Sequence, residues 1–135
     1  MKTQPLIFLF FVVLLTSACQ NNSGERVPLT LNEGEKWVVS DEMKPHITRA
    51  VDIFKKHGAS NNTDYADLSE KLKEQNTKLI KSCNMKGPAH DELHKWLLPH
   101  MKLIEDLGKS ENEQEAANII SELEASFTQY NVYFE

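Results

Sequence analysis

The spacing of apolar residues from Ser40 to the C-terminus is the feature that most restricts the fold of this chain. Apolar side chains return every three or four residues, which is the period that places them on one side of an α-helix. Short polar or glycine-containing turns divide the pattern into four stretches, at residues 41–57, 64–83, 88–107 and about 111–133. Amphipathic helices of this length joined by short loops predict an all-α fold, an up-down-up-down four-helix bundle.

Particular residues predict where these helices begin, end and bend. Thr63 or Asn62 suits the N-cap of the second helix, Gly58 is expected to stop the first, and Pro88 suits a first helical position. Pro99 lies inside the third helix, where a proline removes a backbone hydrogen bond and is expected to bend the helix. His100 projects onto the apolar face of that helix. We therefore expect a hydrogen-bonded core histidine there, facing the carbonyl group that Pro99 leaves free.

The first residues of the chain follow a different pattern. Lys2 precedes an unbroken apolar run from Leu6 to Leu15, and the small residues Thr16-Ser17-Ala18 follow it. A positive start, a short apolar run and a small-residue end are typical of a secretory signal peptide. The run is shorter than the roughly 20 residues that a membrane-spanning helix needs. We therefore expect export from the cytoplasm.

The junction Leu15-Thr16-Ser17-Ala18-Cys19 resembles the lipobox of bacterial lipoproteins, although that family most often has Leu where this chain has Thr16. The resemblance implies that the Cys19 sulfur receives a diacylglycerol and that the chain is cut before it and acylated. It divides the chain into a signal peptide (1–18), a lipidated cysteine and tether (19–39) and a helical domain (40–135). The implied location is the bacterial cell envelope, at the periplasmic face of the outer membrane. A secreted protein with an ordinary cleaved signal, or an uncleaved anchor, is the alternative.

The charge balance restricts the partners. The chain carries 15 Lys and Arg against 20 Asp and Glu, a net charge of −5. This argues against nucleic acid as a partner, since phosphate contacts need a basic face. It also argues against binding to anionic lipid through charge, so the acyl chains are expected to hold the protein at the membrane. No nucleophile is placed beside a base and no glycine-rich phosphate loop is present, so we expect no enzyme.

Cys83 opens the stretch with the most chemically distinctive residues. The chain has two cysteines, and with Cys19 bonded to lipid, Cys83 is the only thiol in an oxidising compartment. Met85, His90 and His94 follow it. The two histidines are four residues apart and lie one turn apart on one helix face, so they can chelate one metal ion.

The predicted topology gathers further donors at the same end of the bundle. There the first helix starts, the second finishes and the third starts, which brings His46 towards the stretch from Cys83 to His94. Thiolate, thioether and imidazole together favour copper, above all Cu(I), or zinc if the thioether is not a ligand. The predicted metal ligands are Cys83, Met85, His90 and His94, with His46 as a further candidate. The competing interpretation is that Cys83 and Met85 are core residues and that His90 is a polar residue of a first helical turn.

Two functions from different classes are consistent with this sequence. The first is a lipid-anchored envelope protein that binds a metal ion, copper before zinc, for sequestration, delivery or sensing. The second is a non-catalytic lipoprotein that docks to an envelope protein complex. In the second case Trp37, Trp96 and the aromatic residues between Tyr130 and Phe134 would form either the contact surface or the core.

Overall fold

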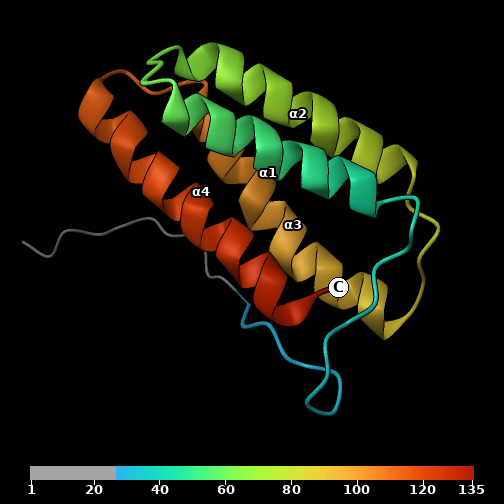
Figure 1. The fold of residues 1–135 in the computed structure, drawn as a ribbon. Helices are drawn as coiled ribbons and strands as arrows, with labels where there is room; N and C mark the ends of the chain where they lie inside the picture. Colours follow the sequence, from blue (N-terminus) through green and yellow to red (C-terminus); the bar gives the residue numbers. More distant parts are fainter. Residues whose placement is uncertain (1–26) are drawn as a thin grey trace, which may run out of the picture.

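The computed structural model describes residues 27–135, which form four α-helices. They are α1 (Lys44–Ala59), α2 (Tyr65–Lys81), α3 (Pro88–Leu107) and α4 (Glu113–Tyr133), and each packs against the next in the chain (Figure 1). The predicted all-α four-helix bundle is confirmed. The predicted signal peptide, Cys19 and the first part of the predicted tether lie outside the described residues. Within residues 27–135, no helix combines the length and the apolar character that a membrane span requires.

The ends of α1 and α2 differ in detail from the sequence prediction. The N-cap of α2 is Asp64, whose carboxylate accepts a hydrogen bond of 3.0 Å from the backbone N–H three residues later. The prediction of Thr63 or Asn62 was therefore wrong, because a carboxylate one residue later takes that role. Helix α1 continues past Gly58 and ends at a C-cap on Ser60, so Gly58 does not stop it.

Particular residues explain where the third and fourth helices start. Helix α3 begins at Pro88 as predicted, after Gly87 with a φ of +72°, a conformation that favours glycine. The helix then runs without a break through Pro99 to Leu107. Helix α4 starts two residues later than predicted, because the Asn112 side chain accepts a hydrogen bond of 2.9 Å from the backbone N–H of Glu115.

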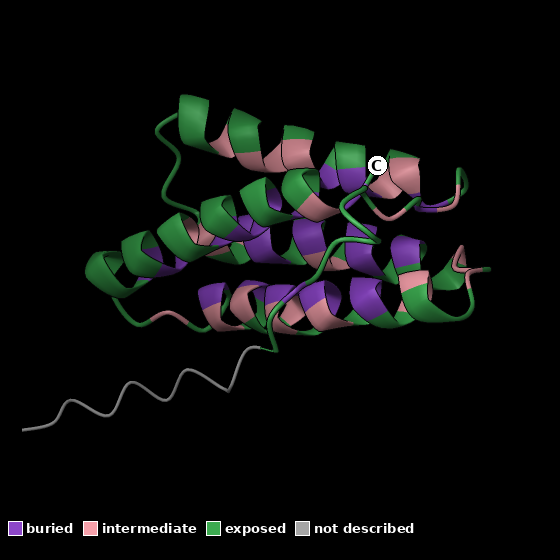
Figure 2. Cartoon of the chain, turned by 90° about the horizontal axis from the view of Figure 1, so that it is seen from below, coloured by how far each residue is buried: buried purple, intermediate pink, exposed green. Residues whose placement is uncertain are grey.

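The core consists of two apolar clusters, and the buried residues lie on the inner faces of the helices (Figure 2). One cluster includes Met43 from the segment before α1, Leu79 from α2, Leu93 from α3 and Tyr130 from α4. The other includes residues from the opposite ends of these helices, such as Leu68 and Ile104. The first cluster therefore gathers, at one end of the bundle, the helix ends that the sequence analysis expected to meet.

His100 is a buried polar residue between α3 and α4. Its Nδ1 lies 2.9 Å from Ser126 Oγ, and its ring stacks on Trp96 and meets the ring of Phe127 edge-on. The Trp96 indole also donates a 2.9 Å hydrogen bond to the Ser126 carbonyl. Burial lowers the pKa of His100 to about 4, so the imidazole is neutral at pH 7. The predicted core histidine is confirmed, but its partner is the Ser126 hydroxyl and not the carbonyl freed by Pro99.

Residues 27–39 form an irregular segment with a tight turn at Glu33-Gly34, here called the N-terminal strap, that packs onto the bundle. The Trp37 N–H donates to the Tyr133 carbonyl at 2.8 Å, and the Glu135 N–H donates to the Trp37 carbonyl at 3.0 Å. Leu29 and Val39 of the strap are buried members of the first core cluster. The packed domain thus includes residues that the sequence analysis assigned to the tether before Ser40.

The strap is also held by a buried carboxylate of α3. Glu92 accepts hydrogen bonds from the Thr30 backbone N–H, from the Thr30 hydroxyl at 3.2 Å and from the Lys95 ammonium at 2.7 Å. Burial raises the pKa of Glu92, but its hydrogen bonds to Lys95 and Thr30 outweigh burial, so that pKa lies below its ordinary value. The ionised carboxylate therefore joins the strap to the first turns of α3.

Candidate metal site

His90 and His94 form a close pair of imidazoles on the surface of α3. Their Nε2 atoms are 3.1 Å apart, and the ring centroids are 4.4 Å apart. The i, i+4 spacing brings both rings to the same side of the helix. The 3.1 Å distance is that of a hydrogen bond between the two Nε2 atoms, with the donor set by the tautomers of the rings. The structure therefore brings together the two residues on which the sequence prediction of a chelate was based.

The separation of the two nitrogens fits bidentate binding of one ion. Imidazole nitrogens bind transition metals at about 2.0–2.1 Å. Two nitrogens at that distance from one ion and 3.1 Å apart subtend an angle of about 95–102° at the metal. This angle lies near the value for adjacent ligands in square-planar or octahedral coordination. The side chains need little movement to exchange their hydrogen bond for a shared ion.

The other nitrogen of His90 faces a carboxylate. His90 Nδ1 lies 3.6 Å from Asp91 Oδ1, and the Asp91 side chain is largely exposed. In metal sites, a ligating histidine commonly points its second ring nitrogen at a carboxylate, which orients the ring and fixes the tautomer with a free Nε2. The neighbouring Glu92 is turned inward towards the strap, so it is not oriented like Asp91.

Cys83 and Met85 lie in the segment between α2 and α3 and are both half-buried. Both side chains pack against the first core cluster. The Cys83 thiol is free, and it is the one cysteine within residues 27–135. Cys83 and Met85 are thus partly buried apolar contacts at the end of the bundle. This packing is what the competing interpretation of the sequence expects.

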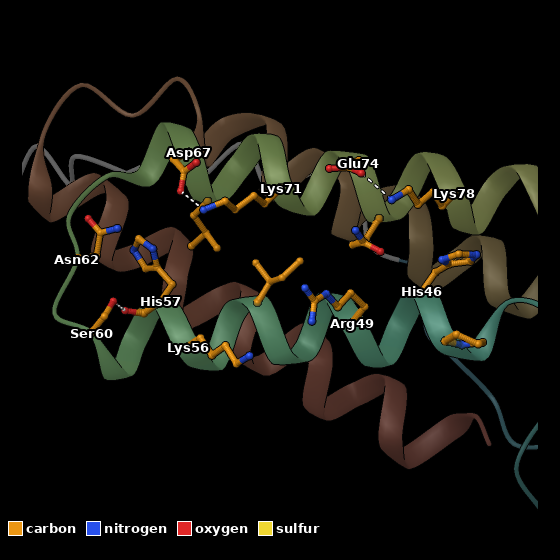
Figure 3. A pocket seen from close by; sticks show the side chains of 14 residues that line it. His46, Arg49, Lys56, His57, Ser60, Asn62, Asp67, Lys71, Glu74 and Lys78 are labelled. Carbon is orange, nitrogen blue, oxygen red and sulfur yellow. Dashed lines mark hydrogen bonds and ion pairs between the residues drawn. The ribbon is translucent and has the colours of Figure 1, made fainter.

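His46 lies in a groove between α1 and α2. Figure 3 shows His46 opposite Lys78 at one end of this groove and His57 opposite Asp67 at the other. The side chain of His46 lines the groove together with residues of α2. Within residues 27–135, no three His, Cys, Asp or Glu side chains come together as a group that could hold a metal ion. Among the five predicted ligands, His90 and His94 have a direct contact between their rings.

Most of the aromatic residues considered for a contact surface are part of the core. Trp96, Tyr130 and Phe134 are buried and in ring contact with one another. Burial raises the pKa of Tyr130 to about 12, so its hydroxyl stays protonated. Trp37 is half-buried, and its indole N–H donates a 2.7 Å hydrogen bond to the Thr30 carbonyl within the strap. These rings hold the end of the bundle and the strap together.

The groove between α1 and α2 is a feature that the sequence analysis missed. It has a volume of about 830 Å³ and is lined by four basic residues and two acidic ones, although the chain as a whole is acidic. The signal in the sequence is a matched spacing, since Arg49 and Lys56 on α1 and Lys71 and Lys78 on α2 are each seven residues apart. No protein-family model matches this chain, and the curated proteins and solved structures include none with significant similarity to it.

Proposed function

We propose that this chain is a lipid-anchored protein of the bacterial envelope that binds one copper ion through His90 and His94. The observation that carries the proposal is the 3.1 Å separation of their Nε2 atoms on an exposed helix face. Two imidazoles without a thiolate favour Cu(II) over Zn²⁺, because copper binds nitrogen donors more tightly than the other divalent metals of its row. Solvent or a second molecule supplies the remaining ligands.

This proposal narrows the ligand set expected from the sequence. Cys83 and Met85 contact the core cluster, and His46 lines the groove between α1 and α2. The proposal therefore assigns binding to the histidine pair and gives Cys83, Met85 and His46 no part in the Cu(II) site. A site of two exposed ligands suits exchange of the ion with other molecules better than permanent storage, so a role in metal delivery or sensing is favoured.

Titration of the full chain in nonionic detergent with Cu(II) tests this function. We expect one ion bound per chain, with affinity at least tenfold weaker in His90→Gln and in His94→Gln. His46→Gln is the matched control, since it removes an imidazole that lines the groove, and it should leave the affinity within twofold. Equal affinity in wild type and His94→Gln would rule the site out. A loss of Cu(II) affinity that occurs only in Cys83→Ala would assign the copper site to the Cys83 thiol.

The anchoring part of the proposal rests on Cys19, and a separate experiment tests it. In the producing bacterium, the wild-type chain should sediment with membranes and partition into detergent. Cys19→Ser removes the sulfur that takes the lipid, so the variant should lose mature membrane-bound protein. Intact mass of the wild-type N-terminal peptide should show acyl chains on Cys19. An unmodified N-terminus would contradict the lipoprotein assignment while leaving the copper site untouched.

A further inference from the structure

The groove between α1 and α2 concentrates positive charge on an acidic protein. Its cations are Arg49 and Lys56 from α1 and Lys71 and Lys78 from α2, against the carboxylates of Asp67 and Glu74. The groove therefore carries a charge of +2 from these side chains, whereas the whole chain has −5. A local positive field on a negative molecule attracts an anionic group to this one surface.

The ion pairs in the groove leave part of its charge available. Lys71 is paired with Asp67 at 2.6 Å, and Lys78 with Glu74 at 2.6 Å, both along α2. Arg49 and Lys56 on the opposite wall take part in no ion pair among residues 27–135. Both residues line the groove, and Figure 3 shows the Arg49 side chain lying along α1. The paired lysines are exposed, and such surface pairs exchange partners at little cost.

The cations are arranged as two pairs with a regular separation. Arg49 and Lys56 are seven residues apart on α1, and Lys71 and Lys78 are seven apart on α2. Seven residues correspond to about 10.5 Å along a helix. A ligand with two acidic groups about 10 Å apart could contact both cations of one pair, or one cation from each end of the groove. Glutamates seven residues apart on a helix have this spacing.

The lining of the groove favours a peptide over a bare polyanion. The partly buried Ile53 contributes apolar surface between the cations, and Gln75 and Asn62 contribute amides. Asp67 and Glu74 at the rim would repel a densely charged chain, whereas a helix with spaced carboxylates can place apolar residues between them.

We propose that the groove between α1 and α2 binds an acidic amphipathic helix of a partner protein, with carboxylates that contact Arg49 and Lys56. This site is separate from the histidine pair and adds a protein partner to the proposed copper function. The partner's apolar face contacts Ile53, and its acidic residues compete with Asp67 and Glu74 for the lysines of α2.

Fluorescence anisotropy with a designed probe tests this proposal. The probe is a labelled 21-residue Ala/Leu helix with glutamate at every seventh position, and its control has glutamine there. The full chain in nonionic detergent should bind the glutamate probe at least tenfold more tightly than the glutamine probe at low salt. The double variant Arg49→Glu with Lys56→Glu should weaken binding at least tenfold. The double variant Arg49→Gln with Lys56→Gln should weaken binding less. Lys55→Glu reverses one charge beside the groove on α1, as each of the two groove substitutions does by itself, and it should change affinity less than twofold.

Each other outcome overturns the assignment. Equal weakening by Lys55→Glu and by the groove variants would show unspecific attraction to the protein surface. Inorganic polyphosphate that binds more tightly than the glutamate probe and displaces it would assign the groove to a phosphate polymer. Binding of vesicles with anionic lipid through Arg49 and Lys56 would assign it to a membrane surface. All substituted side chains are exposed, and unchanged urea unfolding shows that each variant is folded.

Discussion

The buried imidazole of His100 makes the stability of the domain depend on pH in a way that one substitution can isolate. Burial lowers the pKa of His100 to about 4 in the folded protein, whereas an imidazole in the unfolded chain has a pKa of about 6.5. Between these values the unfolded chain binds a proton that the folded one does not. The contribution of His100 to stability is therefore fully present above pH 6.5 and is lost as the pH falls towards 4.

The size of the effect follows from the two pKa values. At pH 4 the unfolded histidine is almost fully protonated and the folded one about half protonated. With about 1.4 kcal/mol per pKa unit, the free energy of unfolding falls by about 3 kcal/mol between pH 7 and pH 4 through this residue alone. His100→Gln does not titrate and keeps a polar group near the Ser126 hydroxyl, so it should lack this part of the decline.

Urea unfolding of wild type and His100→Gln at pH 7, 6, 5 and 4 measures the difference. The carboxylates titrate in both proteins, so their effect cancels when the two free energies are subtracted. We expect wild type to lose about 3 kcal/mol more than His100→Gln over this range. Parallel curves for wild type and His100→Gln would refute the argument from burial.

Two further substitutions test contacts that position the helices and the strap. A Cβ added at Gly108 would lie 2.6 Å from the Oγ of the buried Ser69, so Gly108→Ala should destabilise the fold by about 1–3 kcal/mol in urea unfolding. Ser69→Ala should recover part of that loss in the double variant, and simple additivity would contradict the predicted clash. Glu92→Ala removes the acceptor of the Thr30 N–H, so it should cost about 2 kcal/mol and speed hydrogen exchange at the Thr30 amide. Glu92→Gln keeps an acceptor oxygen and should retain most of the protection, and unchanged exchange in Glu92→Ala would show that the strap is held elsewhere.

The helices could be predicted because their determinants are local. Periodic apolar residues specify the buried face of each helix, and the start of α3 at Pro88 follows from the fixed φ of proline. The end of α1 was less predictable, because Gly58 costs little in the last turn and the helix continues over it. Competing caps such as Asp64 and Thr63 differ by a small free energy, and the surrounding packing decides between them.

The candidate site was predictable only where it depends on one helix. The approach of His90 and His94 follows from their spacing within α3. The positions of Cys83 and His46 depend on how the turn folds back and which side of α1 faces α2, and neither is encoded in a local pattern. The inward turn of Glu92 towards Thr30 joins residues 62 positions apart. The basic groove could not be predicted for the same reason, because its walls come from two helices.

The metal content of the full chain, isolated from its native envelope without added metal or chelator, is the most direct test of the central claim. Elemental analysis should find close to one copper ion per chain in wild type and less than a tenth of that in His94→Gln. His46→Gln, purified in parallel, should retain the wild-type amount. Wild-type protein without copper, or equal copper in wild type and His94→Gln, would contradict the assignment of a copper site to the histidine pair.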